Sequence, residues 1–218
     1  MTPAWAEAIA RAHPRVAIGA RRPWPIRPRA LVVIGGAGAG KTTAVDAVRA
    51  AALPGVVVPL RRVTRPARAG DHPAEAIVVA PAAMAADVAA GVVAPSWWRR
   101  LDGDRRERYG FVASAAPLAV YSANNAIVDP ACALAPPDAL AAAVVVAIAA
   151  SPAVRAARLA ARSPDLAAAE RAARLAEPTP AAHLVIDGDG DDPTAVGAAL
   201  VAVARALRGL SVDAAEAP

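Results

Sequence analysis

The sequence over residues 30–43 is Ala-Leu-Val-Val-Ile-Gly-Gly-Ala-Gly-Ala-Gly-Lys-Thr-Thr. Its first part, Leu31–Ile34, is a short apolar and β-branched run, which is typical of a buried strand. Gly35-x-x-x-x-Gly40-Lys41-Thr42 then matches the Walker A pattern, and residues 43–52 have a composition compatible with a helix. A strand, a glycine-rich turn and a helix in this order predict a phosphate-binding loop.

The residue types of this motif suit the binding of ATP or GTP. Glycines let the backbone curl, so that successive N–H groups point into one concavity at the positive end of a helix. Lys41 is a compact charge that can reach the β- and γ-phosphates, and the hydroxyl of Thr42 is a ligand for Mg²⁺. The residues expected to contact the nucleotide are Gly35, Gly36, Ala37, Gly38, Ala39, Gly40, Lys41, Thr42 and Thr43. A glycine-rich turn that binds nothing is the alternative.

The composition makes Lys41 stand out and excludes several classes of protein. Lys41 is the only lysine among 24 Lys+Arg residues, glutamine is absent, and asparagine occurs only at positions 124 and 125. The 56% hydrophobic content comes mostly from alanine, and no run of about 20 apolar residues predicts a membrane span. Residues 1–15 do not resemble a signal peptide, and Cys132, the single cysteine, cannot form an internal disulfide. We expect a cytoplasmic protein with an anionic partner, since the net charge is +5.

Apolar runs alternate with helix-compatible stretches along the rest of the chain. Strands are predicted over 55–60, 76–79, 118–122, 144–148 and 184–186, and helices over 3–12, 81–90, 151–162, 166–176 and 193–210. This alternation predicts an α/β fold with a mostly parallel sheet that helices cover on both faces. Residues 13–29, rich in proline and arginine, predict an extended arm that packs Trp24 on the domain. Nucleic-acid contact by the arginines of that arm is the alternative.

A second basic cluster follows the strand predicted over 55–60. Residues 61–72 are Arg-Arg-Val-Thr-Arg-Pro-Ala-Arg-Ala-Gly-Asp-His, with four arginines within eight positions. Arg65 and Arg68 can present guanidinium forks to a second phosphate group, separate from those of the nucleotide. A solvated basic loop is the alternative.

These motifs resemble those of the guanylate kinase family. Residues 64–71 follow its Thr-Arg-Pro-x-Arg-x-Gly-acid segment, and Tyr109-Gly110 resembles its Tyr-Gly turn. Ser151-Pro152 and the Arg-Leu-x-x-Arg sequence at 158–162 are similar to its lid helix, and Arg174-Leu175 to a later lid motif. The resemblance covers about residues 30–205. It implies a nucleoside monophosphate kinase-like P-loop domain over residues 28–210, with an arm at 1–27 and a flexible tail at 211–218.

Two departures separate the chain from guanylate kinases. Gly91–Ser96 lacks the glutamate that contacts the guanine ring, and Tyr121–Asn125 stands in place of an Asp-Ile-Asp segment. A related branch, ribose 1,5-bisphosphate phosphokinase, is more similar, since it shares Asp71-His72, Trp97 and Tyr109-Gly110 and also lacks these acids. The charged insert at 99–108 is longer than in either relative.

The resemblance implies an ATP- and Mg²⁺-dependent phosphotransferase that converts a small phosphorylated acceptor, ribose 1,5-bisphosphate, to phosphoribosyl diphosphate. The residues it implies at the acceptor are Arg65, Arg68, Asp71, His72, Trp97 and Tyr109. For His72 an ordinary loop position, and for Trp97 simple core packing, remain alternatives. A guanylate kinase, an inactive phospholigand-binding module and a nucleic-acid binder are the other functions that the sequence leaves open. Neither a membrane nor a nucleic acid is the expected partner.

The lid supplies the remaining catalytic candidates. An acceptor phosphate oxygen needs no general base, so positioning and charge neutralisation supply most of the rate. Together with Lys41, the lid arginines Arg162 and Arg174, and after them Arg158 and Arg171, are expected to stabilise the transferred group. A solvated helix face is the alternative for Arg155 and Arg171. Asp129 and Asp138 are candidates for a second Mg²⁺ ligand only through their proximity to strand ends.

Overall fold

The computed structural model describes most of the chain. The described residues are 1–19, 23–67, 75–100, 106–129, 132, 140, 142–162, 164, 168–176, 179–190 and 192–209. Arg68, Asp71, His72, Asp138, the middle of the charged insert and the tail from 210 lie outside them.

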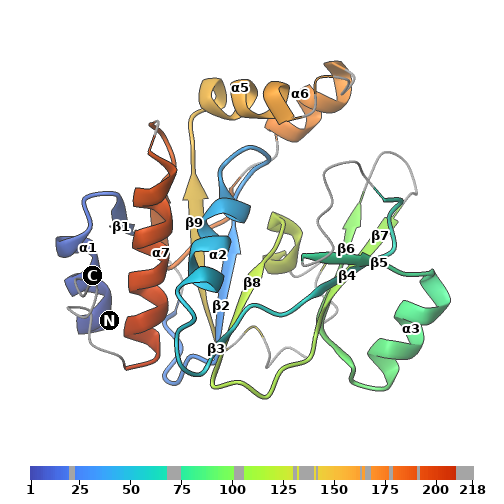
Figure 1. The fold of residues 1–218 in the computed structure, drawn as a ribbon, viewed down its shortest axis with the longest axis horizontal. Coiled ribbons are helices and arrows are strands. Elements are labelled where there is room, and N and C mark those ends of the chain that lie inside the picture. The colour runs from blue at the N-terminus through green and yellow to red at the C-terminus, as the bar shows by residue number, and fades with distance from the viewer. Residues whose placement is uncertain are drawn as a thin grey trace.

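A six-stranded sheet forms the centre of the molecule, in the order β1-β10-β9-β2-β8-β3 (Figure 1). Its strands are β1 (Val16–Ile18), β2 (Ala30–Ile34), β3 (Val56–Val57), β8 (Leu118–Ser122), β9 (Ala143–Ala149) and β10 (Leu184–Asp187). The last five run parallel, whereas β1 pairs antiparallel with β10. All five residues of β2 are buried, as expected of a central strand covered on both faces. The predicted α/β fold with a mostly parallel sheet is confirmed.

Helices cover one face of this sheet and cross its upper edge (Figure 1). They are α1 (Ala4–Ala12), α2 (Lys41–Ala50), α5 (Pro152–Arg162), α6 (Ala168–Ala176) and α7 (Pro193–Leu207). Apolar side chains of α1, α2 and α7 share one core with β2, β8, β9 and β10. Figure 1 shows α5 and α6 beyond the end of β9, on the side where β2 leads into α2. The carboxyl ends of the parallel strands therefore lie on the same side as the start of α2 and helices α5 and α6.

The other face of the central sheet packs against a second, four-stranded sheet and the short helix η1 (Asn125–Val128). This sheet has the order β5-β4-β7-β6, with α3 (Pro81–Ala89) beside it. Its strands are β4 (Arg61–Val63), β5 (Ala76–Val78), β6 (Val93–Arg100) and β7 (Arg106–Val112). Trp97, Phe111 and Tyr121 form a chain of ring contacts, with centroids 5.4 and 4.6 Å apart, between the two sheets. The second sheet is thus held by aromatic packing against β8.

Three segments differ from the sequence-based prediction. The strand predicted over 55–60 is limited to β3 (Val56–Val57), because Pro59 cannot donate a ladder hydrogen bond and the chain leaves the first sheet there. β4, in the second sheet, begins at Arg61, beyond the predicted bounds. The hairpin of β6 and β7 was not predicted, since its mixture of charged, aromatic and small residues contains no clear apolar run. An extended arm over residues 13–29 is wrong for Val16–Ile18, which form an edge strand. Trp24 does pack on the core, as predicted.

The other predicted helices and strands are present within a few residues of their expected bounds. In the part of the chain that the structure describes, no helix has both the length and the apolar character needed to cross a membrane.

Candidate functional site

The phosphate loop joins β2 to α2 and depends on glycine at several positions. Gly38 and Gly40 have φ values of +79° and +101°, a conformation that side-chain-bearing residues rarely adopt. A Cβ atom on Gly38 would lie 2.6 Å from the carbonyl oxygen of Arg155, and one on Gly36 would collide with the Arg155 guanidinium. The loop therefore curls into a tight bowl against α5, with the amino end of α2 at its rim.

Lys41 is held at the mouth of this bowl. Its Nζ donates hydrogen bonds of 2.6 Å to the carbonyl of Gly35 and 3.0 Å to that of Gly36. A cavity of about 280 Å³ opens beside it, lined by Ala37, Gly38, Gly40, Lys41, Thr42, Thr43, Arg158 and Arg162. A lysine, two arginines and a helix amino terminus converge there, which is a donor set suited to a chain of phosphates. The predicted nucleotide loop is thus assembled as a concave, positively charged site.

A second cavity of about 280 Å³ adjoins the first. It is lined by Ala39, Gly40, Thr43, Arg158, Gly188, Gly190, Pro193 and Val196. Arg158 lines both cavities, and its guanidinium donates 2.9 Å hydrogen bonds to the carbonyls of Gly188 and Gly190. Most residues of this second lining are small or apolar, so the cavity suits an uncharged group.

The lid arginines have different positions. Arg155 is 7% exposed and donates to the carbonyls of Ala37 and Leu175, each at 3.1 Å, so it ties the phosphate loop to α6. Arg155 is thus not on a solvated helix face. Arg162 is exposed and lines the phosphate cavity, whereas Arg171 donates to the carbonyl of Pro164 at 3.2 Å. The side chain of Arg174 is not among those described.

The described acceptor candidates form a buried cluster. Arg65, Trp97 and Tyr109 are 4%, 0% and 5% exposed, and the rings of Trp97 and Tyr109 stack with centroids 5.6 Å apart. The hydroxyl of Tyr109 donates a 2.6 Å hydrogen bond to Oε2 of Glu107, itself 6% exposed. Burial raises the pKa of Tyr109, and the bond to Glu107 raises it further, while Arg99 and Arg65 act in the opposite sense. The structure thus brings three predicted residues together around an acidic one that the sequence did not single out.

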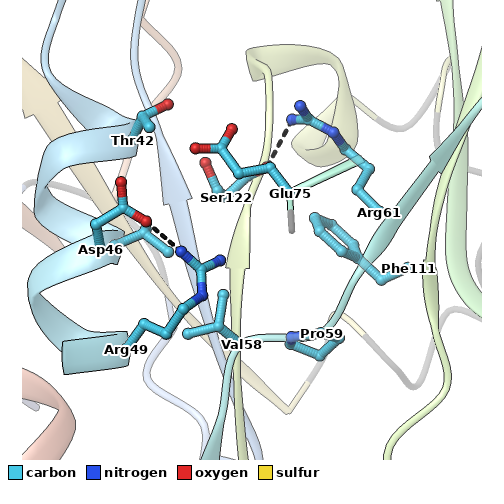
Figure 2. Close-up of a pocket in the computed structure, with 10 residues that line it drawn as sticks. Thr42, Asp46, Arg49, Val58, Pro59, Arg61, Glu75, Phe111 and Ser122 are labelled. Atoms are coloured by element: carbon cyan, nitrogen blue, oxygen red, sulfur yellow. Dashed lines mark hydrogen bonds and ion pairs between the residues drawn. The ribbon is translucent and has the colours of Figure 1, made fainter. Parts of the chain in front are cut away.

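A small cavity of about 20 Å³ lies between α2 and the second sheet (Figure 2). Its lining includes Thr42, which also lines the phosphate cavity, together with Arg61, Glu75 and Ser122. Figure 2 shows the carboxylate of Glu75 pointing toward α2, while Arg61 donates a 3.1 Å hydrogen bond to the carbonyl of Ser122. This arrangement puts groups of both charges next to the Thr42 end of the phosphate site. No local motif marks Glu75 or Ser122, because they meet Thr42 only through the fold.

Two polar residues after β8 support these sites. The amide oxygen of Asn125, which is 5% exposed, accepts a 2.9 Å hydrogen bond from the backbone N–H of Gly35. The amide oxygen of Asn124 accepts bonds of 2.9 Å from Nε1 of Trp97 and 3.1 Å from the N–H of Ala126, where it caps η1. Asparagine occurs nowhere else in the chain, and this rarity is the feature of the sequence that could have pointed to these two residues.

Few of the described residues are suited to bind a metal ion. Within the described ranges, no group of three or more His, Cys, Asp or Glu side chains is arranged to hold a metal ion. Asp129 accepts a contact of 3.3 Å from the thiol of Cys132, and Asp138 lies outside the described residues. Thr42, at the mouth of the loop, is the described residue best placed to ligate Mg²⁺ beside a bound polyphosphate.

No model of a known protein family matches this chain, and no curated protein matches it. Among solved structures, the chain is similar to guanylate kinase from Anaplasma phagocytophilum, with a TM-score of 0.48 and 14% sequence identity. The similarity covers 85% of this chain and 89% of that chain.

Proposed function

We propose that this protein is an ATP-dependent phosphotransferase whose acceptor is a small phosphorylated molecule. The observation that carries the proposal is the convergence of Lys41, Arg158 and Arg162 on the cavity at the amino end of α2. The apolar cavity across Arg158 would take the base, so that one nucleotide spans both cavities. ATP fits this pair of cavities, because one is positively charged and the other is mostly apolar.

The same residues fit a magnesium-bound triphosphate. Thr42 would hold the ion, which when bound neutralises charge on the β- and γ-phosphate oxygens. Lys41 would release the carbonyls of Gly35 and Gly36 and bind the phosphates, while the glycine N–H groups orient them. Arg162 is exposed on α5 and, within the part of the chain that the structure describes, makes none of the hydrogen bonds that hold Arg155, so it would stabilise the transferred group. Arg174 is proposed for the same role from its sequence position.

We place the acceptor beyond Thr42, toward the second sheet. Glu75 can accept hydrogen bonds from sugar hydroxyls, and Arg61 can pair with a phosphate, so the small cavity has suitable groups once it widens. Arg65 and Tyr109 remain our candidates for the acceptor's phosphate, and Glu107 holds the Tyr109 hydroxyl in its absence. Arg68, Asp71, His72 and Trp97 complete the proposed acceptor set.

Ribose 1,5-bisphosphate is the first-choice acceptor, because the guanine-reading acids are absent from residues 91–96 and 121–125. The γ-phosphoryl group of ATP would pass to an oxygen of the acceptor's 1-phosphate, giving ADP and phosphoribosyl diphosphate. The bond from Pγ to the bridging oxygen breaks as the new P–O bond forms, and no general base is needed. A nucleoside monophosphate is the second choice, and a phospholigand-binding module without turnover is the third.

An ADP-release assay with purified protein, MgATP and separate acceptors tests the proposal. Turnover with ribose 1,5-bisphosphate but not with GMP supports the first choice, and the reverse pattern replaces it with guanylate kinase. The Arg162→Ala variant is expected to lower kcat by about 10³-fold if this residue acts as an arginine finger. Release of ADP with none of the acceptors, together with binding of phosphopeptides, would refute the kinase and favour the module.

A further inference from the structure

The backbone of Gly35 is held from both sides. Its N–H donates to the buried amide oxygen of Asn125 at 2.9 Å, and its carbonyl accepts from Nζ of Lys41 at 2.6 Å. Asn125 belongs to η1, 90 positions further along the chain, so this contact fixes the first residue of the phosphate loop to the end of β8. The peptide groups of one glycine thus connect Asn125 to the only lysine of the chain.

The side chain at position 125, which accepts the hydrogen bond from Gly35, has to be neutral for this arrangement to bind phosphates. A carboxylate in the same place would accept the Gly35 N–H equally well, and 19 Asp and Glu residues show that acids are common in this chain. It would, however, attract the ammonium of Lys41 and repel the triphosphate in a partly buried site, where charges interact strongly. The amide keeps the hydrogen bond to Gly35 and adds no negative charge beside the phosphate loop.

We propose that Asn125 is a positioning residue for the phosphate loop and that its neutral amide preserves the positive charge of the nucleotide site. Asn125 holds Gly35 in place, and Gly35 in turn provides the carbonyl on which Lys41 rests. The proposal rests on nucleotide binding by this loop, the central element of the proposed function.

Asn125→Asp, Asn125→Leu and Asn124→Asp test it by calorimetric titration with MgATP. Asn125→Asp is expected to raise Kd on the order of tenfold or more, and further than Asn125→Leu, which removes the hydrogen bond to Gly35 without adding a charge. Asn124→Asp is the matched control, because the same charge one residue away caps η1 and faces Nε1 of Trp97, so Kd should stay within about threefold. Thermal unfolding of each variant confirms that it is folded.

If Asn125 had a purely structural role, the order of MgATP affinities for Asn125→Asp and Asn125→Leu would be the opposite. If Asn125 only stabilised the fold, the nearly isosteric Asp, which keeps the acceptor, would bind MgATP better than Leu. That order, or equal losses for Asn125→Asp and Asn124→Asp, overturns the inference. If Asn125→Asp does not fold, Asn125→Leu still tests the proposal. This variant is expected to bind MgATP more weakly and adenosine with unchanged affinity. An equal loss of affinity for MgATP and adenosine would refute the proposal. Absence of MgATP binding by the wild-type protein would instead refute the proposed function itself.

Discussion

The hydroxyl of Tyr109 donates a 2.6 Å hydrogen bond to Oε2 of Glu107, and the two residues are 5% and 6% exposed. They lie two positions apart on β7 and therefore point to the same side of the second sheet. Because Arg65 and Arg99 act on the same hydroxyl, a buried acid and two cations share the region proposed for the acceptor's phosphate. An incoming phosphate would take over the partners that Glu107 now has.

The Glu107→Gln substitution should lower the pKa of Tyr109 toward about 10, the ordinary value for tyrosine. The pKa should stay somewhat above that value, because burial is the larger cause of the shift and remains in the variant. The pKa of Tyr109 can be measured from tyrosinate absorbance in an alkaline titration. The chain has only one other tyrosine, Tyr121, which serves as an internal reference because burial alone raises its pKa. An unchanged titration curve would show that Glu107 does not act on Tyr109.

The raised pKa of Tyr109 also predicts how stability depends on pH. The folded state holds the phenolic proton more tightly than the unfolded state, so this contribution is present in full below about pH 10 and is lost as pH rises through the raised pKa. The wild-type protein should therefore lose more stability between pH 9 and pH 11 than Tyr109→Phe, as denaturant unfolding would measure. Equal losses in both proteins would contradict the assignment.

Substitutions of Arg155 and Arg162, which both lie on α5, should distinguish a structural role from a catalytic one. Arg155→Ala removes two hydrogen bonds from a buried guanidinium and should lower the free energy of unfolding by about 2–4 kcal/mol. Arg162→Ala alters an exposed side chain and should leave that free energy within about 0.5 kcal/mol while turnover falls. Urea unfolding of both variants decides, and a large stability loss for Arg162→Ala would remove it from the proposed catalytic set.

Gly38→Ala and Gly91→Ala form a matched pair in the left-handed backbone region. Their φ values are +79° and +70°, but a Cβ at Gly38 would meet the Arg155 carbonyl, while nothing lies within 4 Å of one at Gly91. Gly91→Ala should cost about 1 kcal/mol of backbone strain, and Gly38→Ala should cost more and also abolish nucleotide binding. Similar losses for the two variants would mean that the loop does not pack against α5 as described.

Thr42→Val should uncouple nucleotide binding from magnesium. The substitution keeps the shape of the side chain but removes the hydroxyl that we propose as the metal ligand. Calorimetry with ATP, with and without Mg²⁺, should show that the ion strengthens binding to the wild type and has little effect on the variant. An equal effect of Mg²⁺ on both proteins would exclude Thr42 as a ligand.

The sequence predicts the local part of this molecule well. The glycine-rich turn between β2 and α2 is a contiguous motif, so residues 35–42 predict its shape without knowledge of the fold. The parallel strands are also evident, because buried strands such as Val144–Ile148 are continuous apolar runs. The hairpin of β6 and β7 is different: the charged residues Arg106, Glu107 and Arg108 directly precede Tyr109, and which of them are buried depends on the sheet in which they lie.

The supporting residues of the site are the part that sequence alone does not give. Asn125 contacts Gly35 across 90 positions of the sequence. Glu75, which directly precedes β5, lines the same small cavity as Thr42 only because of the fold. Arg155 lies in an amphipathic helix, and the sequence alone does not show that its side chain contacts the backbone of Ala37 and Leu175 instead of solvent. Such pairings depend on the topology, whereas composition showed only that asparagine is rare in this chain.

Calorimetric titration of the wild-type protein and Lys41→Ala with MgATP tests the central claim most directly. We predict measurable heat and saturable binding for the wild type, and a loss of affinity on the order of 100-fold for the variant, since Lys41 supplies the only ammonium side chain at the phosphates. Arg11→Ala, which removes an equal charge from a side chain that is 73% exposed on α1, serves as the control and should bind as the wild type does. Equal affinity in Lys41→Ala and Arg11→Ala, or no binding by the wild type, would contradict the account.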